Sequence, residues 1–379
     1  MKNWRLELAL SILLLPACAA AQAPTPSDAS ALEQQGKLAE AAHAWQAITQ
    51  VNPRDASAFA SLGLVLSKEE KYAVAVPAYK RAIILNPHLP GVELNLGLAE
   101  FKQGHFQSAI GPLRKALAAD PKSMQARTLL GLSYYGAKQF AEASKNLEVA
   151  AKADPTNAEL QQVLAQSCLA ANKYSCALEQ FHKILERNPD SVAAHVLVGE
   201  ALDGLHRTPE AIAEFQTAIK AAPHEPGLHF GLGYLHWKAH EYDSAKTDFN
   251  NELAVDPQNA QALAYLGDIE MQNNNPDAAI PFLKKATEIR ADIRIAYMDL
   301  GAIFTEQKHY SDAIAALGQA EKLEPAQPDA HFRLGRLYEA MGNKAAAERE
   351  FAKVRELHEK ADESVTSKMP GSPPPPLKP

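Results

Sequence analysis

Residues 56–89 read ASAFASLGLVLSKEEKYAVAVPAYKRAIILNPHL, and most of the chain repeats this pattern at a constant period. The clearest marker of the period is proline, at positions 53, 87, 121, 155, 189, 223, 257 and 325, where every interval equals one period or two. A fixed period of about 34 residues indicates one structural unit copied many times, which favours an array of repeats over a globule. Such an array leaves little of the 379 residues for a separate catalytic domain.

Other positions keep the same phase as the proline. Alanine recurs at 75, 109, 143, 177, 211, 245, 279, 313 and 347. Glycine recurs at 63, 97, 131, 199, 233, 267, 301 and 335, with Ala165 as the single departure. A large apolar residue recurs at Tyr79, Leu113, Leu147, Phe181, Phe215, Phe249, Leu283, Leu317 and Phe351. Small residues in this phase let two helices approach closely, and the large residue fills the space beside them.

This pattern resembles the tetratricopeptide repeat (TPR), in which Leu-Gly and Tyr positions on a first helix are followed by Ala-x3-Phe on a second helix and by a closing Pro. The resemblance covers residues 22–361 and implies an all-α fold, a right-handed α-solenoid of about ten helix-turn-helix repeats. We expect a degenerate first repeat at 22–55, where Ala29 replaces the glycine, and nine further repeats at 56–89, 90–123, 124–157, 158–191, 192–225, 226–259, 260–293, 294–327 and 328–361.

Three features depart from a regular array. Pro77, Pro112 and Pro281 fall inside predicted second helices, near their starts, where we expect a modest distortion and not a break. The repeat at 260–293 ends in Arg290-Ala291, without its proline. The second helix of the last repeat is expected to run on with a charged outer face, because a terminal helix must cover the end of the stack.

The two ends of the chain lie outside the array. Residues 1–21 have the layout of a secretory signal, a basic start followed by a short apolar run and small residues. Three alternatives follow for this segment. A bacterial lipobox is resembled by Leu15-Pro16-Ala17-Cys18, which would make Cys18 a lipidation site. Cleavage near Ala21 would instead release a soluble protein, and the third alternative is no cleavage. We therefore expect an exported protein, in the periplasm or anchored to the outer membrane by lipid. Residues 362–379 are rich in proline and are expected to be a disordered tail.

Composition and motifs argue against several classes of function. The net charge is −7, and no basic stripe of the kind that binds nucleic acid is present in the sequence. The sequence contains no glycine-rich phosphate loop, no Gly-x-Ser-x-Gly elbow and no His-Glu-x-x-His metal motif. We therefore expect no enzymatic activity, cofactor or metal site, and we expect the partner to be a protein or peptide. Membrane contact is expected only through an N-terminal lipid, and the sequence does not determine the oligomeric state.

Two small sets of residues could carry chemistry. Cys168 and Cys176 lie in one predicted hairpin, and an exported protein meets an oxidising compartment, so a disulfide is one interpretation and two buried apolar thiols the other. His229, His236 and His240 follow one helical stripe, so a metal- or small-ligand-binding envelope protein is the alternative function. The structural interpretation competes here as well, because His229 and His236 occupy repeat positions that face neighbouring helices.

The resemblance to TPR proteins also implies where a partner binds. In that family the first helices line a concave groove, so this chain is expected to be a protein-binding scaffold. The matching inward positions are Leu64, Asn95, Leu98, Phe101, Leu132, Tyr135, Glu200, Asp203, Phe230, Tyr234, Trp237, Tyr265, Asp268 and Met271, followed by Asp299, Arg333 and Arg336. We expect Phe230, Tyr234 and Trp237 to face the groove and not the neighbouring helix. The Lys and Asn residues with which some TPR domains clamp a peptide carboxylate are absent from the corresponding positions, so an apolar or aromatic peptide fits better.

Overall fold

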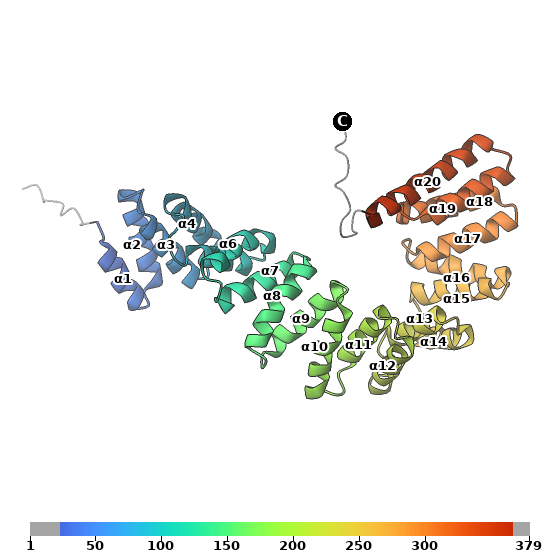
Figure 1. Cartoon of the computed structure of the whole chain (residues 1–379), viewed down its shortest axis with the longest axis horizontal. Helices are drawn as coiled ribbons and strands as arrows, with labels where there is room; N and C mark the ends of the chain where they lie inside the picture. The colour runs from blue at the N-terminus through green and yellow to red at the C-terminus, as the bar shows by residue number, and fades with distance from the viewer. Residues whose placement is uncertain (1–22, 367–379) are drawn as a thin grey trace, which may run out of the picture. The chain divides into compact units, whose positions relative to one another are not determined.

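The computed structural model describes residues 23–366, and within that range every regular element is an α-helix (Figure 1). The helices are α1 (Pro26–Gln34), α2 (Leu38–Val51), α3 (Ala56–Lys68), α4 (Tyr72–Leu85), α5 (Val92–Lys102), α6 (Phe106–Ala119), α7 (Met124–Gly136), α8 (Phe140–Ala153), α9 (Ala158–Ala170), α10 (Tyr174–Arg187), α11 (Val192–Gly204), α12 (Thr208–Ala221), α13 (Leu228–Lys238), α14 (Tyr242–Val255), α15 (Ala260–Gln272), α16 (Pro276–Ile289), α17 (Arg294–Glu306), α18 (Tyr310–Leu323), α19 (Pro328–Ala340) and α20 (Lys344–Thr366). The predicted signal sequence, with Cys18, lies outside the described residues.

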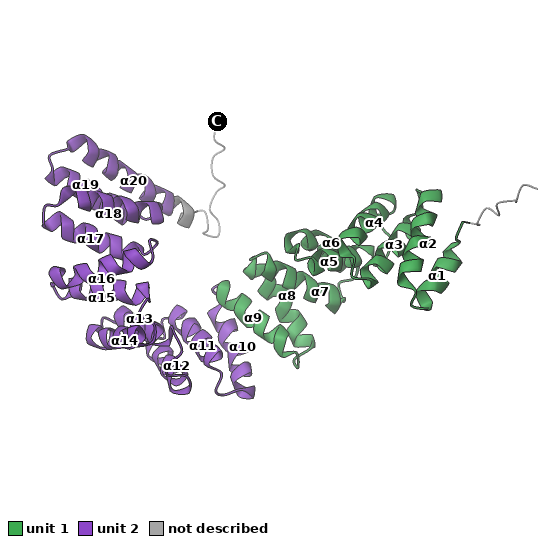
Figure 2. Ribbon diagram, turned by 180° about the vertical axis from the view of Figure 1, so that it is seen from behind, with its two compact units in different colours: residues 1–171 green, residues 172–379 purple. Residues whose placement is uncertain are grey.

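The helices fall into two compact units, which Figure 2 distinguishes by colour. The first spans residues 1–171 and contains α1–α9, and the second spans residues 172–379 and contains α10–α20. From α1 to α8 in the first unit, and from α11 to α20 in the second, an odd-numbered helix (helix A) packs against the even-numbered helix that follows it (helix B), as α3 does on α4 and α15 on α16. By their order in the chain α9 is likewise an A helix and α10 a B helix. Successive A helices also touch, α5 with α7 in the first unit and α15 with α17 in the second. This is the predicted α-solenoid of helix-turn-helix repeats.

Close packing between helices A and B explains the glycine and large-residue phases of the sequence. A Cβ atom added to Gly63 would lie 2.7 Å from the ring of Tyr79, and one added to Gly97 would lie 2.5 Å from Cγ of Leu113. The same contact, always at the same separation along the chain, recurs in the pairs Gly131–Leu147, Gly199–Phe215, Gly233–Phe249, Gly267–Leu283, Gly301–Leu317 and Gly335–Phe351. The close approach predicted at these glycines is confirmed.

The turn between helices A and B has one backbone conformation throughout the described repeats. Its left-handed residue recurs once in every repeat, at Gly36, Glu70, Gly104, Lys138, Asn172, His206, His240, Asn274, Lys308 and Gly342, with φ between 57° and 75°. Only three of these ten residues are glycine, although other residues adopt this conformation at a cost of about 1–2 kcal/mol. The repeat geometry therefore overrides local preference at the turn.

The starts of the A helices differ in a way that matters for the candidate site. Polar side chains cap α3, α7, α9, α11 and α15, for example Asp55, which accepts hydrogen bonds from the amides of Ser57 and Ala58. The residue at the corresponding position before α17 is Ile293, which provides no side-chain cap. Two other A helices, α5 and α13, begin late, after Gly91 and Gly227 with positive φ.

Most helix limits agree with the predictions from the sequence. The helices α4, α6 and α16 continue through Pro77, Pro112 and Pro281, as predicted. The first repeat forms both of its helices despite its degenerate sequence. The tail predicted to begin at residue 362 was placed too early, because α20 extends to Thr366. No helix in residues 23–366 is long and apolar enough to span a membrane.

Candidate binding site

The inward positions predicted in the first unit lie on three A helices. Leu64 on α3, Asn95, Leu98 and Phe101 on α5, and Leu132 and Tyr135 on α7 are all half-buried. Their partners include the next A helix, since the hydroxyl of Tyr135 donates a hydrogen bond of 2.8 Å to Oε1 of Gln166 on α9. The side chains therefore line one face of successive A helices, as the repeat phase predicts, and part of that face is already occupied by contacts within the unit.

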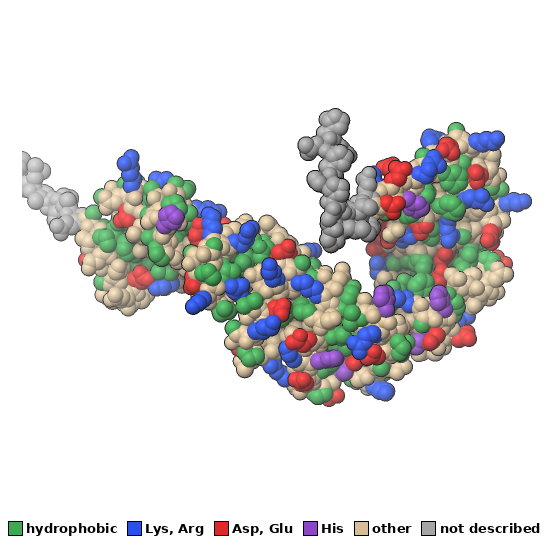
Figure 3. All heavy atoms as spheres, in the orientation of Figure 1, with side chains coloured by type: hydrophobic (Ala, Val, Ile, Leu, Met, Phe, Trp, Pro, Cys, Tyr) green, Lys and Arg blue, Asp and Glu red, His purple; other side chains and the backbone are tan. Residues whose placement is uncertain are grey.

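In the second unit the same positions carry more charge and more aromatic surface. Glu200 is exposed, whereas Asp203 and Met271 are half-buried. Asp203 on α11 pairs with Lys238 on α13, with 2.5 Å between Oδ1 and Nζ. Charged and apolar side chains are interspersed on the visible surface of each unit in Figure 3.

Five aromatic side chains form a connected group, here called the aromatic cluster: Phe230, Tyr234, Trp237, Phe249 and Tyr265. The ring of Tyr265, on α15, is central, with its centroid 4.9 Å from that of Trp237, 5.5 Å from that of Phe249, 5.7 Å from that of Tyr234 and 5.9 Å from that of Phe230. Phe249, on α14, is fully buried, and the other four rings are half-buried. Edge-to-face and offset contacts of this kind stabilise aromatic pairs.

One part of the prediction about these residues is wrong, namely that they avoid the neighbouring helix. Phe230, Tyr234 and Trp237 were expected to face the groove and not the neighbouring helix, but all three pack against Tyr265 on the next A helix. The physical reason is that a ring at this position gains more by covering apolar surface on α15 than by remaining in water. The helical spacing placed the three rings on one stripe, but it did not reveal that Tyr265 would meet them.

The aromatic cluster is held in place by two buried carboxylates. Nε1 of Trp237 donates a hydrogen bond of 2.6 Å to Oδ2 of Asp268, which is 5% exposed. Glu252, fully buried on α14, accepts hydrogen bonds from the backbone amides of Gly227 and Phe230, at 2.7 and 3.1 Å. A carboxylate on these first amides of α13 also complements the helix dipole. The position of α13 is therefore fixed by its neighbours.

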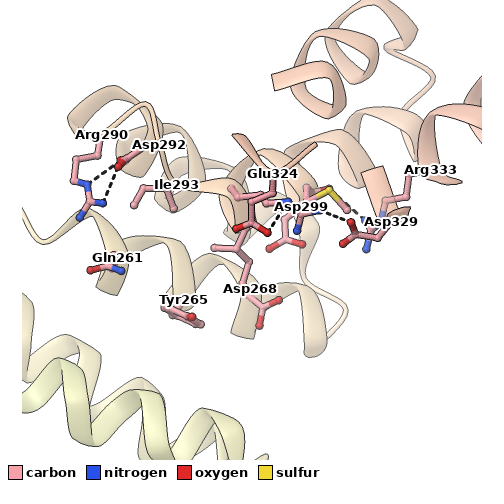
Figure 4. Close-up of a pocket in the computed structure, with 13 residues that line it drawn as sticks. Gln261, Tyr265, Asp268, Arg290, Asp292, Ile293, Asp299, Glu324, Asp329 and Arg333 are labelled. Atoms are coloured by element: carbon pink, nitrogen blue, oxygen red, sulfur yellow. Dashed lines mark hydrogen bonds and ion pairs between the residues drawn. The ribbon is translucent and has the colours of Figure 1, made fainter. Parts of the chain in front are cut away.

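A cavity of about 470 Å³ lies beside the aromatic cluster, within the second unit (Figure 4). We call it the acidic pocket. The A helices α15, α17 and α19 provide Tyr265, Asp268, Asp299 and Arg333, and the ends of α16 and α18 provide Arg290 and Glu324. The remaining lining residues are Gln261, Asp292, Ile293, Arg294, Ile295, Met298 and Asp329.

Most charged groups of the acidic pocket already have a partner. Arg290 binds Asp292 through two hydrogen bonds, of 3.0 and 3.1 Å, and Arg294 pairs with Glu324 and Asp329. Asp299 differs, because it is 8% exposed and its Oδ2 atom is buried with no hydrogen-bond partner among the described residues. Burial, reinforced by the charge of Asp268 and partly offset by that of Arg333, raises the pKa of Asp299 to about 7.

Sequence reasoning found only part of this pocket. The repeat phase identified Tyr265, Asp268, Asp299 and Arg333, but it missed the residues from the loop before α17 and from the ends of α16 and α18. A signal for them exists in the sequence, since the repeat at 260–293 is the one that ends in Arg290-Ala291 in place of its closing proline. The lost proline and the lost polar cap at Ile293 mark the place where this cavity forms.

The three histidines of the alternative function do not form a metal-binding group. Nδ1 of His236 lies 2.7 Å from Oδ2 of Asp248, and Nδ1 of His240 lies 2.9 Å from the hydroxyl of Tyr242 in the turn after α13. Nδ1 of His229 is buried with no hydrogen-bond partner in the described part of the chain. Across residues 23–366, no three His, Cys, Asp or Glu side chains are grouped as metal ligands.

The two cysteines of the array are oxidised in the structure. Both Cys168, at the end of α9, and Cys176, at the start of α10, are disulfide-bonded. Their oxidation and pairing in the purified protein stay predictions, and thiol titration of the unfolded chain before and after reduction tests them.

Comparison with known proteins gives the class. Sequence models described as tetratricopeptide or TPR repeats match residues 28–90, 163–226 and 230–292, and also 100–167, 301–342 and 329–361. These matches cover most of the chain, which therefore belongs to the TPR family. TPR repeats mediate binding between proteins, so the chain is a protein-interaction scaffold in its general class.

Several solved structures align with part of the chain. One is YrrB, described as a TPR protein with an unusual peptide-binding site, at 20% identity over 51% of this chain and 99% of that chain, with a TM-score of 0.39. Two structures of MamA are similar, at 23% identity over 44% of this chain and 97% of that chain, and at 21% identity over 48% and 100%, each with a TM-score of 0.39. No curated protein sequence matches the chain significantly.

Proposed function

We propose that the protein is a non-catalytic scaffold of the bacterial cell envelope that binds a peptide or protein segment along the A helices of its second unit. The observation that carries this proposal is the aromatic cluster with the acidic pocket beside it. Half-buried aromatic side chains that are fixed by their neighbours are typical anchors of protein interfaces. The matching family models are all repeat models, which supports a binding role without catalysis.

The chemistry of this face suggests the kind of segment that it binds. Tyr234 and Trp237 offer ring surface for apolar or aromatic side chains, whereas Phe230 already packs on buried Phe249 and serves the core. Two carboxylates contact the same helix, α13: Asp268 accepts from Trp237, and Asp203 pairs with Lys238. We therefore infer an extended segment with apolar or aromatic side chains, held in a groove that is acidic in this part.

Site-directed photo-crosslinking tests where the partner binds. A benzoylphenylalanine at position 234, in the full-length protein in its native envelope, should give a discrete adduct with a partner. The matched control replaces Asn251, an exposed residue on α14, by the same group. Adduct formation at Tyr234 but not at Asn251 supports the proposal, and equal labelling at the two positions, or none at either, overturns it.

The envelope location rests on the signal-like residues 1–21, and it has its own test. Mass spectrometry of the mature N-terminus separates a lipid-modified Cys18 from a chain cleaved near Ala21 and from an uncleaved chain. Either processed form supports export. An intact Met1 in the protein recovered from cells would contradict the proposed location and leave the binding function to be judged separately.

A further inference from the structure

The acidic pocket contains a buried carboxylate that the protein itself leaves without a hydrogen-bond donor. Asp299, on α17, is only 8% exposed, and its Oδ2 atom has no hydrogen-bond partner among residues 23–366. A buried acceptor that lacks a donor costs about 1–3 kcal/mol, and more when it is charged. Because Asp299 also lines an open cavity, a small movement of its side chain would present this carboxylate to a donor from outside the chain.

Neighbouring carboxylates are satisfied in other ways. Oδ2 of Asp268 accepts the indole hydrogen bond of Trp237, and its Oδ1 lies 3.4 Å from Nε2 of Gln272. Asp292 pairs with Arg290, as Figure 4 shows, and Glu324 and Asp329 pair with Arg294. Asp299 is therefore the one carboxylate of this pocket that has neither a hydrogen bond nor an ion pair to a described residue.

The balance of charge in the pocket favours a cation over an anion. Its lining contains five carboxylates, on Asp268, Asp292, Asp299, Glu324 and Asp329, and three guanidinium groups, on Arg290, Arg294 and Arg333, so the sum is −2 when all are ionised. Two of the three guanidinium groups are engaged by carboxylates. The third, on exposed Arg333, donates through Nη1 to the carbonyl oxygen of Met298 at 3.2 Å. A ligand anion would thus meet one available guanidinium group and an excess of negative charge.

We propose that the acidic pocket binds one positively charged group of the partner, an ammonium or a guanidinium, through an ion pair with the carboxylate of Asp299. This inference rests on the proposed function, because it names the chemistry of a segment bound along the same A helices. The charged group can come from a lysine side chain, an arginine side chain or the amino terminus of a peptide, and all three share the donor chemistry that Asp299 lacks.

The remaining walls suit such a group. Tyr265 lines the cavity and is half-buried, so aromatic surface, which attracts cations, forms part of its wall. Burial, with the nearby Tyr234 and Asp268, raises the pKa of Tyr265 to about 12, so its hydroxyl stays neutral at physiological pH. Met298 and Ile295 provide apolar surface for the methylene groups of a long side chain.

The chain provides a reporter for this pocket. It contains three tryptophans, Trp4, Trp45 and Trp237, so the indole region of a nitrogen–proton correlation spectrum holds few signals. The indole of Trp237 donates to Asp268 in the wall of the pocket, whereas Trp45 lies on α2 in the first unit. A ligand in the acidic pocket should therefore shift the Trp237 signal and leave that of Trp45 in place.

Four small probes test the charge and its source, each titrated into the full-length protein at about pH 7.5 with ionic strength held constant. Three are cationic: N-acetyl-lysine methylamide, N-acetyl-arginine methylamide and alanine methylamide with a free amino group. N-acetyl-norleucine methylamide has nearly the shape of the lysine probe without its charge. At least one cationic probe should shift the Trp237 signal to saturation, and the probe that binds best identifies the source of the cation. Equal binding of the norleucine probe would overturn the proposal.

Two variants and a control assign the effect to Asp299. Asp299→Asn keeps the shape and should weaken the best cationic probe by about tenfold or more, because a charge-assisted bond is lost. Arg333→Gln, at about pH 8.5 where Asp299 is ionised, should strengthen binding by about threefold, because a repelling charge is removed. Glu306→Gln changes an exposed carboxylate at the end of α17 and should have no effect. Unchanged binding by Asp299→Asn, or weaker binding by Arg333→Gln, would refute the ion pair.

The outcome separates this inference from the proposed function. Cationic probes that bind through Asp299, together with no crosslinked partner at Tyr234, would keep the pocket and remove the scaffold proposal. A crosslinked partner that the Asp299→Asn variant captures as well as the original protein does would keep the scaffold and remove the cation site.

Discussion

Replacing Asp299 by asparagine is expected to stabilise the protein at alkaline pH, which is unusual for a substitution of a buried residue. The pKa of Asp299 is about 7 in the folded chain against 3.8 for a free aspartate, because burial and the charge of Asp268 outweigh the attraction of Arg333. Between these two values the folded state binds more protons than the unfolded state does, so the free energy of unfolding falls as pH rises. The free-energy cost of ionising Asp299 in the folded state is complete above about pH 7, where the difference between the two pKa values amounts to about 4 kcal/mol.

The free energy of unfolding of the original protein and that of the Asp299→Asn variant should be compared at two pH values. Urea unfolding, followed by the fluorescence of Trp237 in a background where Trp4 and Trp45 are phenylalanine, reports on the helices around the pocket. From about pH 5 to about pH 8 the chain with Asp299 should lose about 3 kcal/mol more stability than the Asp299→Asn variant, since the amide does not titrate. Parallel pH profiles for the two proteins would refute the assignment of a raised pKa to an unpartnered carboxylate.

Three further predictions concern the repeat architecture. Gly97→Ala should destabilise the first unit by about 1–3 kcal/mol in urea unfolding, because the added Cβ atom would lie 2.5 Å from Cγ of Leu113 on the partner helix. Gly111→Ala is the control: a Cβ atom there has nothing within 4 Å, so this substitution should stabilise the unit by up to about 1 kcal/mol. Lys138→Gly should raise the thermal midpoint, with a gain of about 1 kcal/mol or less, because φ at this turn is 59°; a lower midpoint would show that the lysine side chain contributes more than the backbone costs. Burial alone lowers the pKa of His195, but hydrogen bonds, first to Glu214, raise it above its ordinary value of 6.5. The stabilisation that protonated His195 gives is therefore complete below pH 6.5 and is lost as pH rises through the native pKa. The difference in urea midpoint between the original chain and His195→Gln should shrink from about pH 6 to about pH 8.

The sequence predicted the fold closely because each repeat is specified by contacts that are local in the chain. Gly97 and Leu113 meet within one hairpin, so the phase of each residue type directly reports the contact that it makes. The same phase placed the inward positions on the A helices. Because every repeat contacts only its neighbours, the residue pattern within one period is enough to define the repeating unit.

The candidate site was only partly predictable, because it depends on contacts between repeats. Helical spacing put Phe230, Tyr234 and Trp237 on one stripe, but the ring of Tyr265 that covers them lies on the next A helix, in the following repeat of the chain. The sequence lists Asp268 and Asp299 as similar acidic residues at inward positions. Only the packing distinguishes them, because one receives a hydrogen bond from Trp237 and the other has no donor.

The sequence by itself thus determined the repeat, the helix pairs, the close contacts within each hairpin and the TPR class, since these follow from residue types at fixed spacings within a single period. The tertiary structure decided which inward side chains cover one another, that a cavity borders the repeat end without its closing proline, and which carboxylate lacks a donor. Such features arise where side chains of successive repeats meet, and their energies depend on burial and on the nearest partner atom, which spacing along the chain does not specify.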